Sequence, residues 1–365
     1  MPTKKRSIPV PAPEDACFAK ELAGENPPTF AAMQQLYELA TELFVLLPWQ
    51  VLDEDELIVV RDGVTGEFRY CSVMGALGEV FAMHAYAGAE GLSVFREIQS
   101  RDSDDPSEFF VRMNSLYVDF VPRAELDRPD RDLLNALGHP RGSKAMAPMF
   151  RCIRPGCHAW FVTAEEARTL ADCIRAVVVV CQAVVEGDSG SFWDEPDSYP
   201  LVTCQDENGE TFQIDRIKPV LPPEPPVAAV SLGEDVLRGL RGQDSAVGGV
   251  MELDCIYGGP PIGKKNERKT CSLVALALDA QTAMILGMEA ADANGAPGEA
   301  MAMAFLKALE AIRTLPLEVR VRSAKHQASL APLMESFGVK LSVAQRLPAF
   351  EAARTHFMEF MSRGK

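Results

Sequence analysis

The sequence lacks any run of 18 or more apolar residues, so we expect no membrane-spanning helix and no membrane partner. Its nine cysteines are odd in number and scattered, which is not the pattern of a disulfide-stapled secreted domain. Neither the Gly-x-Ser-x-Gly elbow of serine hydrolases nor the His-Glu-x-x-His helix of zinc proteases occurs. With only five histidines in 365 residues, the chain offers no obvious acid–base site.

The start of the chain has no apolar core of the kind that a secretory signal needs. Met1-Pro-Thr-Lys-Lys-Arg6 is basic, but Ile8-Pro-Val-Pro-Ala-Pro-Glu-Asp15 follows it. We therefore expect the protein to be cytoplasmic.

The charge of the chain is negative and unevenly placed. The net charge is -16: residues 1–227 hold 20 Lys and Arg against 37 Asp and Glu, whereas residues 228–365 hold 16 against 15. Nucleic-acid binding depends on neutralising phosphates, so the acidic first part is predicted to repel nucleic acid. Solubility is the simplest reason for such a charge. If the acidic surface binds anything, we expect a protein partner.

Composition divides the chain into a leader, two domains and a linker. Residues 1–28 are Pro-rich and polar and are predicted to be a mobile leader, and residues 221–227 (LPPEPPV) to be a stiff linker. Residues 30–220 mix helical and strand patterns, which indicates an acidic α+β domain. Its predicted helices are 30–47, 78–88, 105–116, 128–137 and 163–185, and its extended segments 57–60, 68–73, 117–122, 150–162, 201–204 and 211–217, with a hairpin turn at Asn208-Gly209.

The last domain, residues 228–365, has the clearest pattern. Apolar and polar residues alternate over 250–257, which predicts a first strand. An apolar run at 270–279 is followed by a short turn and a further apolar segment at 283–289, so we predict three hairpin-connected strands. The following strand–helix–strand steps require right-handed crossovers and predict parallel pairing. The predicted helices are 298–313, 324–337 and one from Pro348 onward, and the predicted strands are 317–321 and 339–344.

This order of three strands followed by helix, strand, helix, strand and helix resembles the ribonuclease-H-like superfamily, which includes nucleases, integrases and transposases. The resemblance implies an α/β fold and two divalent metal ions, Mg²⁺ or Mn²⁺, held between carboxylates. Asp254 and Glu252 on the first strand and Glu351 on the final helix match that pattern. At the end of the fourth strand, Val321-Arg322-Ser323-Ala324 has a serine where the superfamily has an acid, which weakens cation binding.

A basic segment separates the first two strands of this domain. Gly258-Gly-Pro-Pro-Ile-Gly263-Lys264-Lys265 nearly matches a phosphate loop, but Lys265 replaces the required hydroxyl and a strand follows instead of a helix. We therefore interpret the segment as the tip of a long hairpin. A contact with nucleic acid or, with simpler electrostatics, with the acidic first domain would use its basic residues: Lys264, Lys265, Arg268 and Lys269.

Short motifs in the first domain carry a second resemblance. They are Pro48-Trp49, Thr65-Gly66-Glu67, Tyr70-Cys-Ser-Val-Met-Gly75, Leu77-Gly78-Glu79, Phe150-Arg-Cys152, Arg154-Pro-Gly156 and Trp160. Together they resemble an uncharacterised family of bacterial proteins, from which the chain departs at Cys152, in place of serine, and at Ala159, in place of proline. That family has no established activity, so the resemblance implies a domain of unknown function and no mechanism.

Two functions from different classes are compatible with these patterns. The preferred one is a non-catalytic interaction or regulatory protein whose acidic first domain presents the binding surface and which needs no cofactor. The alternative is a metal-dependent nuclease or phosphoryl-transfer enzyme that uses Asp254, Glu252 and Glu351 with Mg²⁺ or Mn²⁺. The missing acid of the fourth strand favours the non-catalytic interaction protein, because it weakens cation binding. A fold alone does not imply an activity.

Overall fold

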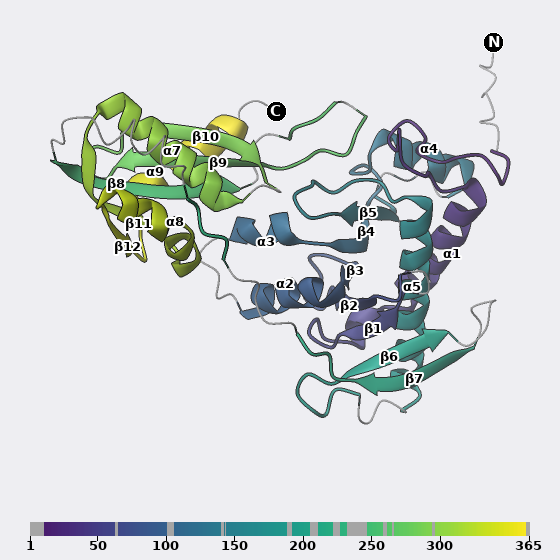
Figure 1. Cartoon of the computed structure of the whole chain (residues 1–365). Coiled ribbons are helices and arrows are strands. Elements are labelled where there is room, and N and C mark those ends of the chain that lie inside the picture. The colour runs from purple at the N-terminus through teal and green to yellow at the C-terminus, as the bar shows by residue number, and fades with distance from the viewer. Residues whose placement is uncertain are drawn as a thin grey trace, which may run out of the picture.

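The structure, a computed structural model, shows two modules, each built around one β-sheet with helices packed against it (Figure 1). It describes residues 11–62, 65–100, 106–139, 142, 144–187, 192–204, 211–221, 227–231, 247–257, 261–264, 266–293 and 296–362. Five sequence predictions fall wholly or partly outside these residues: the first part of the leader, the Asn208-Gly209 turn, most of the linker (222–226), the start of the predicted hairpin tip (258–260) and Lys265.

The first module is built on a mixed sheet that has seven strands within the described residues. Their order is β5-β4-β3-β2-β1-β6-β7, and every neighbouring pair is antiparallel except β1 and β6, which are parallel. The strands are β1 (Ile58–Arg61), β2 (Phe68–Met74), β3 (Ala82–Ala87), β4 (Ser115–Pro122), β5 (Met146–Ile153), β6 (Tyr199–Cys204) and β7 (Phe212–Ile217).

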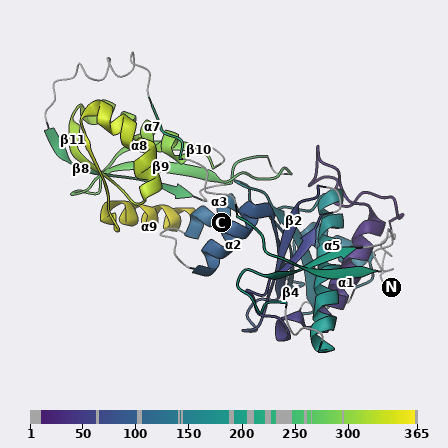
Figure 2. The ribbon, with the colours of Figure 1, turned by 60° about the horizontal axis from the view of Figure 1, so that its bottom comes forward.

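Helices lie on both faces of this sheet. On one face, α1 (Phe30–Leu46) and α5 (Ala164–Val185) bury the larger core, and the short η1 (Pro48–Gln50) follows α1. On the other face, α2 (Gly88–Ser100) packs Leu92 and Phe95 against strand residues such as Tyr86. Figures 1 and 2 show α2 and the adjoining α3 (Pro106–Arg112) between the first sheet and the second module. The first module also contains α4 (Arg128–Ala136).

The predicted starts of the two long helices are confirmed by their caps. Thr29 Oγ1 accepts the Ala32 N–H at 3.2 Å at the start of α1. At the start of α5, Thr163 Oγ1 accepts the Glu166 N–H at 3.3 Å, and the Glu166 carboxylate accepts the Thr163 N–H at 2.8 Å. This reciprocal capping box satisfies two backbone donors that a helix end otherwise leaves without partners.

The helix predicted at 78–88 is wrong. The chain makes a turn after β2 and then runs as β3, between β2 and β4. This strand is central and covered on both faces, so its side chains are nearly all buried and the polar–apolar alternation of a half-buried strand is missing. Gly88, with φ of 61°, then takes the chain directly into α2, for which no helix was predicted.

Residues 11–29 pack onto the first module, although most of them belong to the predicted mobile leader. Leu22 is 2% exposed, and the Trp160 indole N–H donates to the Glu21 carbonyl at 2.7 Å. A further backbone hydrogen bond joins Ala164 to Asn26 at 2.8 Å. This part of the chain is therefore one wall of the first core.

The second module contains a five-stranded mixed sheet, again counted within the described residues, of order β10-β9-β8-β11-β12. β8, β9 and β10 are antiparallel, whereas β11 is parallel to both β8 and β12. The strands are β8 (Val247–Tyr257), β9 (Ser272–Asp279), β10 (Ile285–Asp292), β11 (Leu315–Val321) and β12 (Lys340–Val343). The hairpins and the parallel crossovers predicted for this domain are confirmed.

Within the part of the chain that the structure describes, two helices cover one face of this sheet and one covers the other. α7 (Pro297–Ile312) and α8 (Ala324–Phe337) pack on the face that carries Leu253 and Cys255. α9 (Pro348–Ser362) packs Phe350 against the opposite face, beside Ile256. Alternate residues of β8 thus enter two different cores, as the period of a strand requires.

A segment of the second module reaches the first. After β8 the chain extends as an arm, residues 261–264 and 266–271, which returns to β9 along the first module (Figure 1). The His158 N–H donates to the Lys269 carbonyl at 2.9 Å, and the Cys271 N–H donates to the Gly156 carbonyl at 2.7 Å. These backbone hydrogen bonds give the junction a short antiparallel pairing.

Ion pairs reinforce this junction. The Arg268 side chain is 9% exposed, and its Nη2 lies 3.5 Å from Glu25 and 3.8 Å from Glu166 of the first module. Burial alone would raise the pKa of Glu166, but hydrogen bonds from Thr163, Cys152 and Arg154 outweigh it and hold that pKa below its ordinary value. Glu166 therefore stays ionised opposite Arg268. The prediction that the basic segment docks on the acidic domain is confirmed for this residue.

The first module in turn contributes to the second core. Val111 of α3 is buried with the apolar residues of β8 and α7, and its carbonyl accepts the Gly156 N–H at 2.6 Å. Each module therefore contributes residues that pack against the other. In the described residues, no helix is both long and apolar enough to cross a membrane.

Substituting Arg268→Gln should loosen the junction. Glu25 and Glu166 would lose a cationic partner that is shielded from water, so we expect the free energy of unfolding to fall by about 1–3 kcal/mol. Hydrogen exchange should accelerate at the His158 and Cys271 amides. The control is Lys264→Gln, because Lys264 is 87% exposed and its surface pair with Glu267 contributes little. Unchanged exchange in Arg268→Gln would contradict this role.

Candidate functional site

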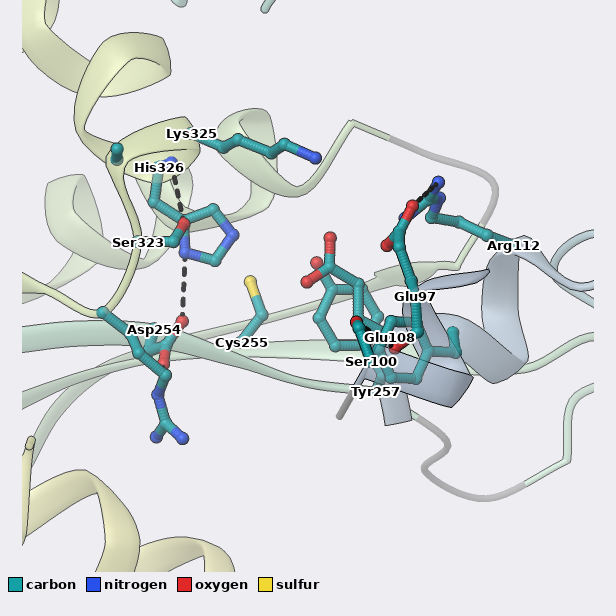
Figure 3. Close-up of a pocket in the computed structure, with 13 residues that line it drawn as sticks. Glu97, Ser100, Glu108, Arg112, Asp254, Cys255, Tyr257, Ser323, Lys325 and His326 are labelled. Carbon is teal, nitrogen blue, oxygen red and sulfur yellow. Dashed lines mark hydrogen bonds and ion pairs between the residues drawn. The ribbon is translucent and has the colours of Figure 1, made fainter. Parts of the chain in front are cut away.

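A pocket of about 250 Å³ lies at the junction and is lined by both modules. The first module contributes the end of α2 and one side of α3, and the second contributes β8 and the turn from β11 into α8 (Figure 3). The lining residues are Glu97, Ser100, Glu108, Phe109, Arg112, Asp254, Cys255, Tyr257, Arg322, Ser323, Ala324, Lys325 and His326.

Asp254 is the most buried carboxylate of this pocket, with 3% exposure. Its Oδ2 accepts a hydrogen bond from Nε of Arg322 at 2.8 Å, and its Oδ1 lies 3.2 Å from Nδ1 of His326. Asp254 lies on β8, Arg322 directly follows β11, which is parallel to β8, and His326 lies in the first turn of α8. Figure 3 shows Asp254 and His326 side by side. Each oxygen of this carboxylate therefore faces a cationic or ionisable group of the protein.

Ser323 explains why α8 begins at this wall. Its Oγ accepts the His326 N–H at 3.1 Å, so the serine that stands in place of the expected acid is the N-cap of the helix. The cap fixes the His326 backbone, and the first turn of α8 directs its backbone N–H groups and its positive end toward the pocket.

The opposite wall belongs to the first module and is acidic. Arg112 donates to both oxygens of Glu97, at 2.8 and 3.0 Å, and to Glu90 at 3.1 Å. Burial alone would raise the pKa of Glu97, but its hydrogen bonds with Arg112 dominate and lower that pKa. Glu108 of α3 is not part of this ion pair, and Figure 3 shows its carboxylate directed into the pocket.

Cys255 lines the pocket but is not placed to act as a nucleophile. Burial, followed by the nearby charges of Asp254 and Glu108, raises the pKa of its thiol well above the usual range. The thiol points at the Pro297 carbonyl, 3.9 Å away. Because the thiolate is the reactive form, Cys255 serves as part of the apolar wall.

Glu252, one of the three predicted metal ligands, has a structural partner. It is 2% exposed, and its carboxylate accepts the Phe350 N–H at 2.9 Å. Burial raises its pKa, although backbone hydrogen bonds from Phe350 and Ala349 oppose the increase. Glu252 thus joins β8 to the first turn of α9, where backbone donors lack partners within the helix.

Glu351, the third predicted ligand, lies at the surface at the start of α9. Its side chain is 37% exposed and stands 3.7 Å from Arg346. Across the described part of the chain, no group of three or more His, Cys, Asp or Glu side chains is arranged to hold a metal ion. The carboxylates Asp254, Glu252 and Glu351 therefore do not fit a Mg²⁺ or Mn²⁺ site in this arrangement, and their catalytic role stays a prediction.

The sequence reasoning missed Arg322, Lys325, His326 and Glu108. One signal was available for the first three: they follow directly on the end of a parallel strand, the edge at which α/β sheets bind ligands. Glu108 gave no such signal, because its place depends on how the two modules dock.

Comparison with known proteins shows two families along the chain. Residues 34–199 match a family described as "Domain of unknown function (DUF7309)", and residues 236–358 match "Domain of unknown function (DUF6930)". No curated protein and no solved structure matches the chain. The two matched segments correspond to the two modules, and neither family name carries an activity.

Replacing the buried carboxylate of Glu252 should change how stability depends on pH. Its raised pKa means that the folded chain binds the proton more tightly than the unfolded chain. The stability that it contributes is therefore present at acidic pH and declines as the pH rises above about 4.3, the ordinary value for Glu. Glu252→Gln keeps an acceptor for the Phe350 N–H without the charge, so its stability relative to wild type should increase from about pH 4 to pH 7.

The measurement is urea unfolding of both proteins at several pH values across that interval. Glu335→Gln is the control, since it removes an exposed carboxylate of α8, on the other face of the sheet from the Glu252 contact. A stability difference between wild type and Glu252→Gln that stays constant with pH would show that burial of the Glu252 charge has no energetic consequence.

Proposed function

We propose that the protein is a non-catalytic binding protein with a regulatory role, and that its ligand is bound in the pocket between the modules. The observation that carries this proposal is the set of contacts that Asp254 makes inside the pocket. Its two oxygens face Arg322 and His326, in the wall of a cavity that both modules form. Such a set of preorganised polar groups in a concave site is typical of ligand recognition.

The strand order of the second module supports its assignment as a ribonuclease-H-like scaffold with an altered centre. In such a scaffold the acid of the first strand binds a divalent cation. Here a guanidinium lies against that acid, and a cation of charge two would be repelled by Arg322 at close range. The neighbouring Ser323 caps α8 and adds no charge. The same positions therefore suit binding better than metal-assisted phosphoryl transfer.

The acidic first module fits this role in two ways. It supplies the carboxylates of one pocket wall, Glu97 and Glu108, and its excess negative charge disfavours nucleic acid as a partner. A regulatory protein of this design would couple ligand binding at the junction to a protein partner on the acidic surface. Closure of the junction around a ligand is the physical link between the two events.

Filling the pocket should abolish ligand binding. Ala324 lines the pocket and is exposed, so Ala324→Trp places an indole in the cavity without disturbing the core. Ala328→Trp, one turn further along α8 and also exposed, is the matched control outside the lining. We expect ligand-observed NMR with a mixture of small polar metabolites to detect at least one compound that binds wild type and Ala328→Trp but not Ala324→Trp.

Two results would contradict the proposal. One is a screen in which no compound binds the wild-type chain. The other is a set of binders whose signals are the same with Ala324→Trp, because their site would then lie elsewhere on the molecule.

A further inference from the structure

The two walls of the pocket carry opposite charge. The second module contributes the start of α8 and the Lys325 ammonium, beside the Asp254–Arg322 ion pair, whose two charges offset each other. The first contributes the carboxylates of α2 and α3. Charged groups on separate modules thus face one space of about 250 Å³, with Tyr257 and Phe109 as apolar surfaces. A ligand that satisfies both walls must itself be dipolar.

The positive wall is built to receive an anionic group. His326 is 9% exposed, and its Nδ1 lies 3.2 Å from Oδ1 of Asp254. Figure 3 shows the opposite edge of the ring turned away from Asp254, toward the cavity. At this wall the backbone N–H groups at the start of α8 and the Lys325 ammonium can donate hydrogen bonds to a carboxylate.

The negative wall leaves one carboxylate for a cationic group. Glu97 is held in a bidentate pair by Arg112, so most of its charge is compensated. No ion pair holds Glu108 within the described residues, and its carboxylate points into the cavity from α3 (Figure 3). An ammonium group of a ligand would be attracted to this oxygen pair.

We propose that this pocket binds a small zwitterion of the α-amino acid class, with its carboxylate at the start of α8 and Lys325 and its ammonium at Glu108. This proposal rests on the proposed function and names its ligand class. The pocket volume lies below the range of about 300–1,000 Å³ for drug-sized ligands, which suits a molecule of this size. Because the two charged walls belong to different modules, the zwitterion bridges the junction.

The test is calorimetric titration of the full chain with each of the twenty α-amino acids. For the best binder, the matching amine without the carboxylate and the matching acid without the ammonium are titrated in parallel. We expect at least one amino acid to bind, and both truncated compounds to bind at least about tenfold more weakly, since each leaves one charged wall without a partner.

Charge variants assign the two ends of the ligand. Lys325→Gln should weaken binding of the amino acid about tenfold and leave binding of the amine unchanged. Glu108→Gln should also weaken binding of the amino acid about tenfold, but it should leave binding of the acid unchanged. Lys144→Gln and Glu186→Gln change exposed residues outside the pocket and should have no effect. Such reciprocal changes in selectivity do not arise from a general loss of folding.

The outcomes separate this inference from the proposed function. The zwitterion proposal would be overturned if the acid or the amine bound as tightly as the amino acid. It would also be overturned if no amino acid bound at millimolar concentration. If another compound class still binds wild type and fails to bind Ala324→Trp, the pocket keeps its function with a different ligand. Amino acid binding that survives in Ala324→Trp would overturn both.

Discussion

The ion pair between Asp254 and Arg322 is the constraint on which the second module and its pocket depend. A carboxylate that is 3% exposed is costly to bury unless a charged partner and hydrogen bonds compensate for the lost water. Arg322 and His326 provide that compensation from the end of β11 and the start of α8. Their positions fix where α8 begins, and the first turn of α8 is the positive wall of the pocket.

The second constraint is the docking of the modules. The arm pairs through Lys269 and Cys271 with the backbone near Gly156, while Arg268 lies against Glu25 and Glu166. Val111 of α3 is buried in the second core, so the docked position is held by apolar contacts as well. Because α3 carries Glu108, the same contacts place a carboxylate opposite α8. The pocket is therefore a property of the junction, and neither module would form it alone.

How far the sequence predicted this structure depends on the range of the interactions. The second sheet was predicted well because its strands and helices are separated by clear turns and follow local periodicity, and the long helix predicted at 163–185 was found as α5. Residues 82–87 were assigned wrongly because a strand buried on both faces shows no alternation. The pairing of Asp254 with Arg322, 68 residues away, and the approach of Glu108 to α8 have no local signature. The predicted metal ligands kept their positions, but Glu252 and Glu351 serve α9 or the surface instead.

The account stands on the claim that Asp254 is an ion-paired structural carboxylate and binds no catalytic metal. The most direct measurement is cleavage of labelled single- and double-stranded DNA and RNA by the full chain with Mg²⁺ or Mn²⁺. Wild type is compared with Asp254→Asn and with Asp132→Asn, whose surface carboxylate is 66% exposed. The account predicts no cleavage that depends on Asp254. Metal-dependent cleavage that is present in wild type and Asp132→Asn but lost in Asp254→Asn would contradict it.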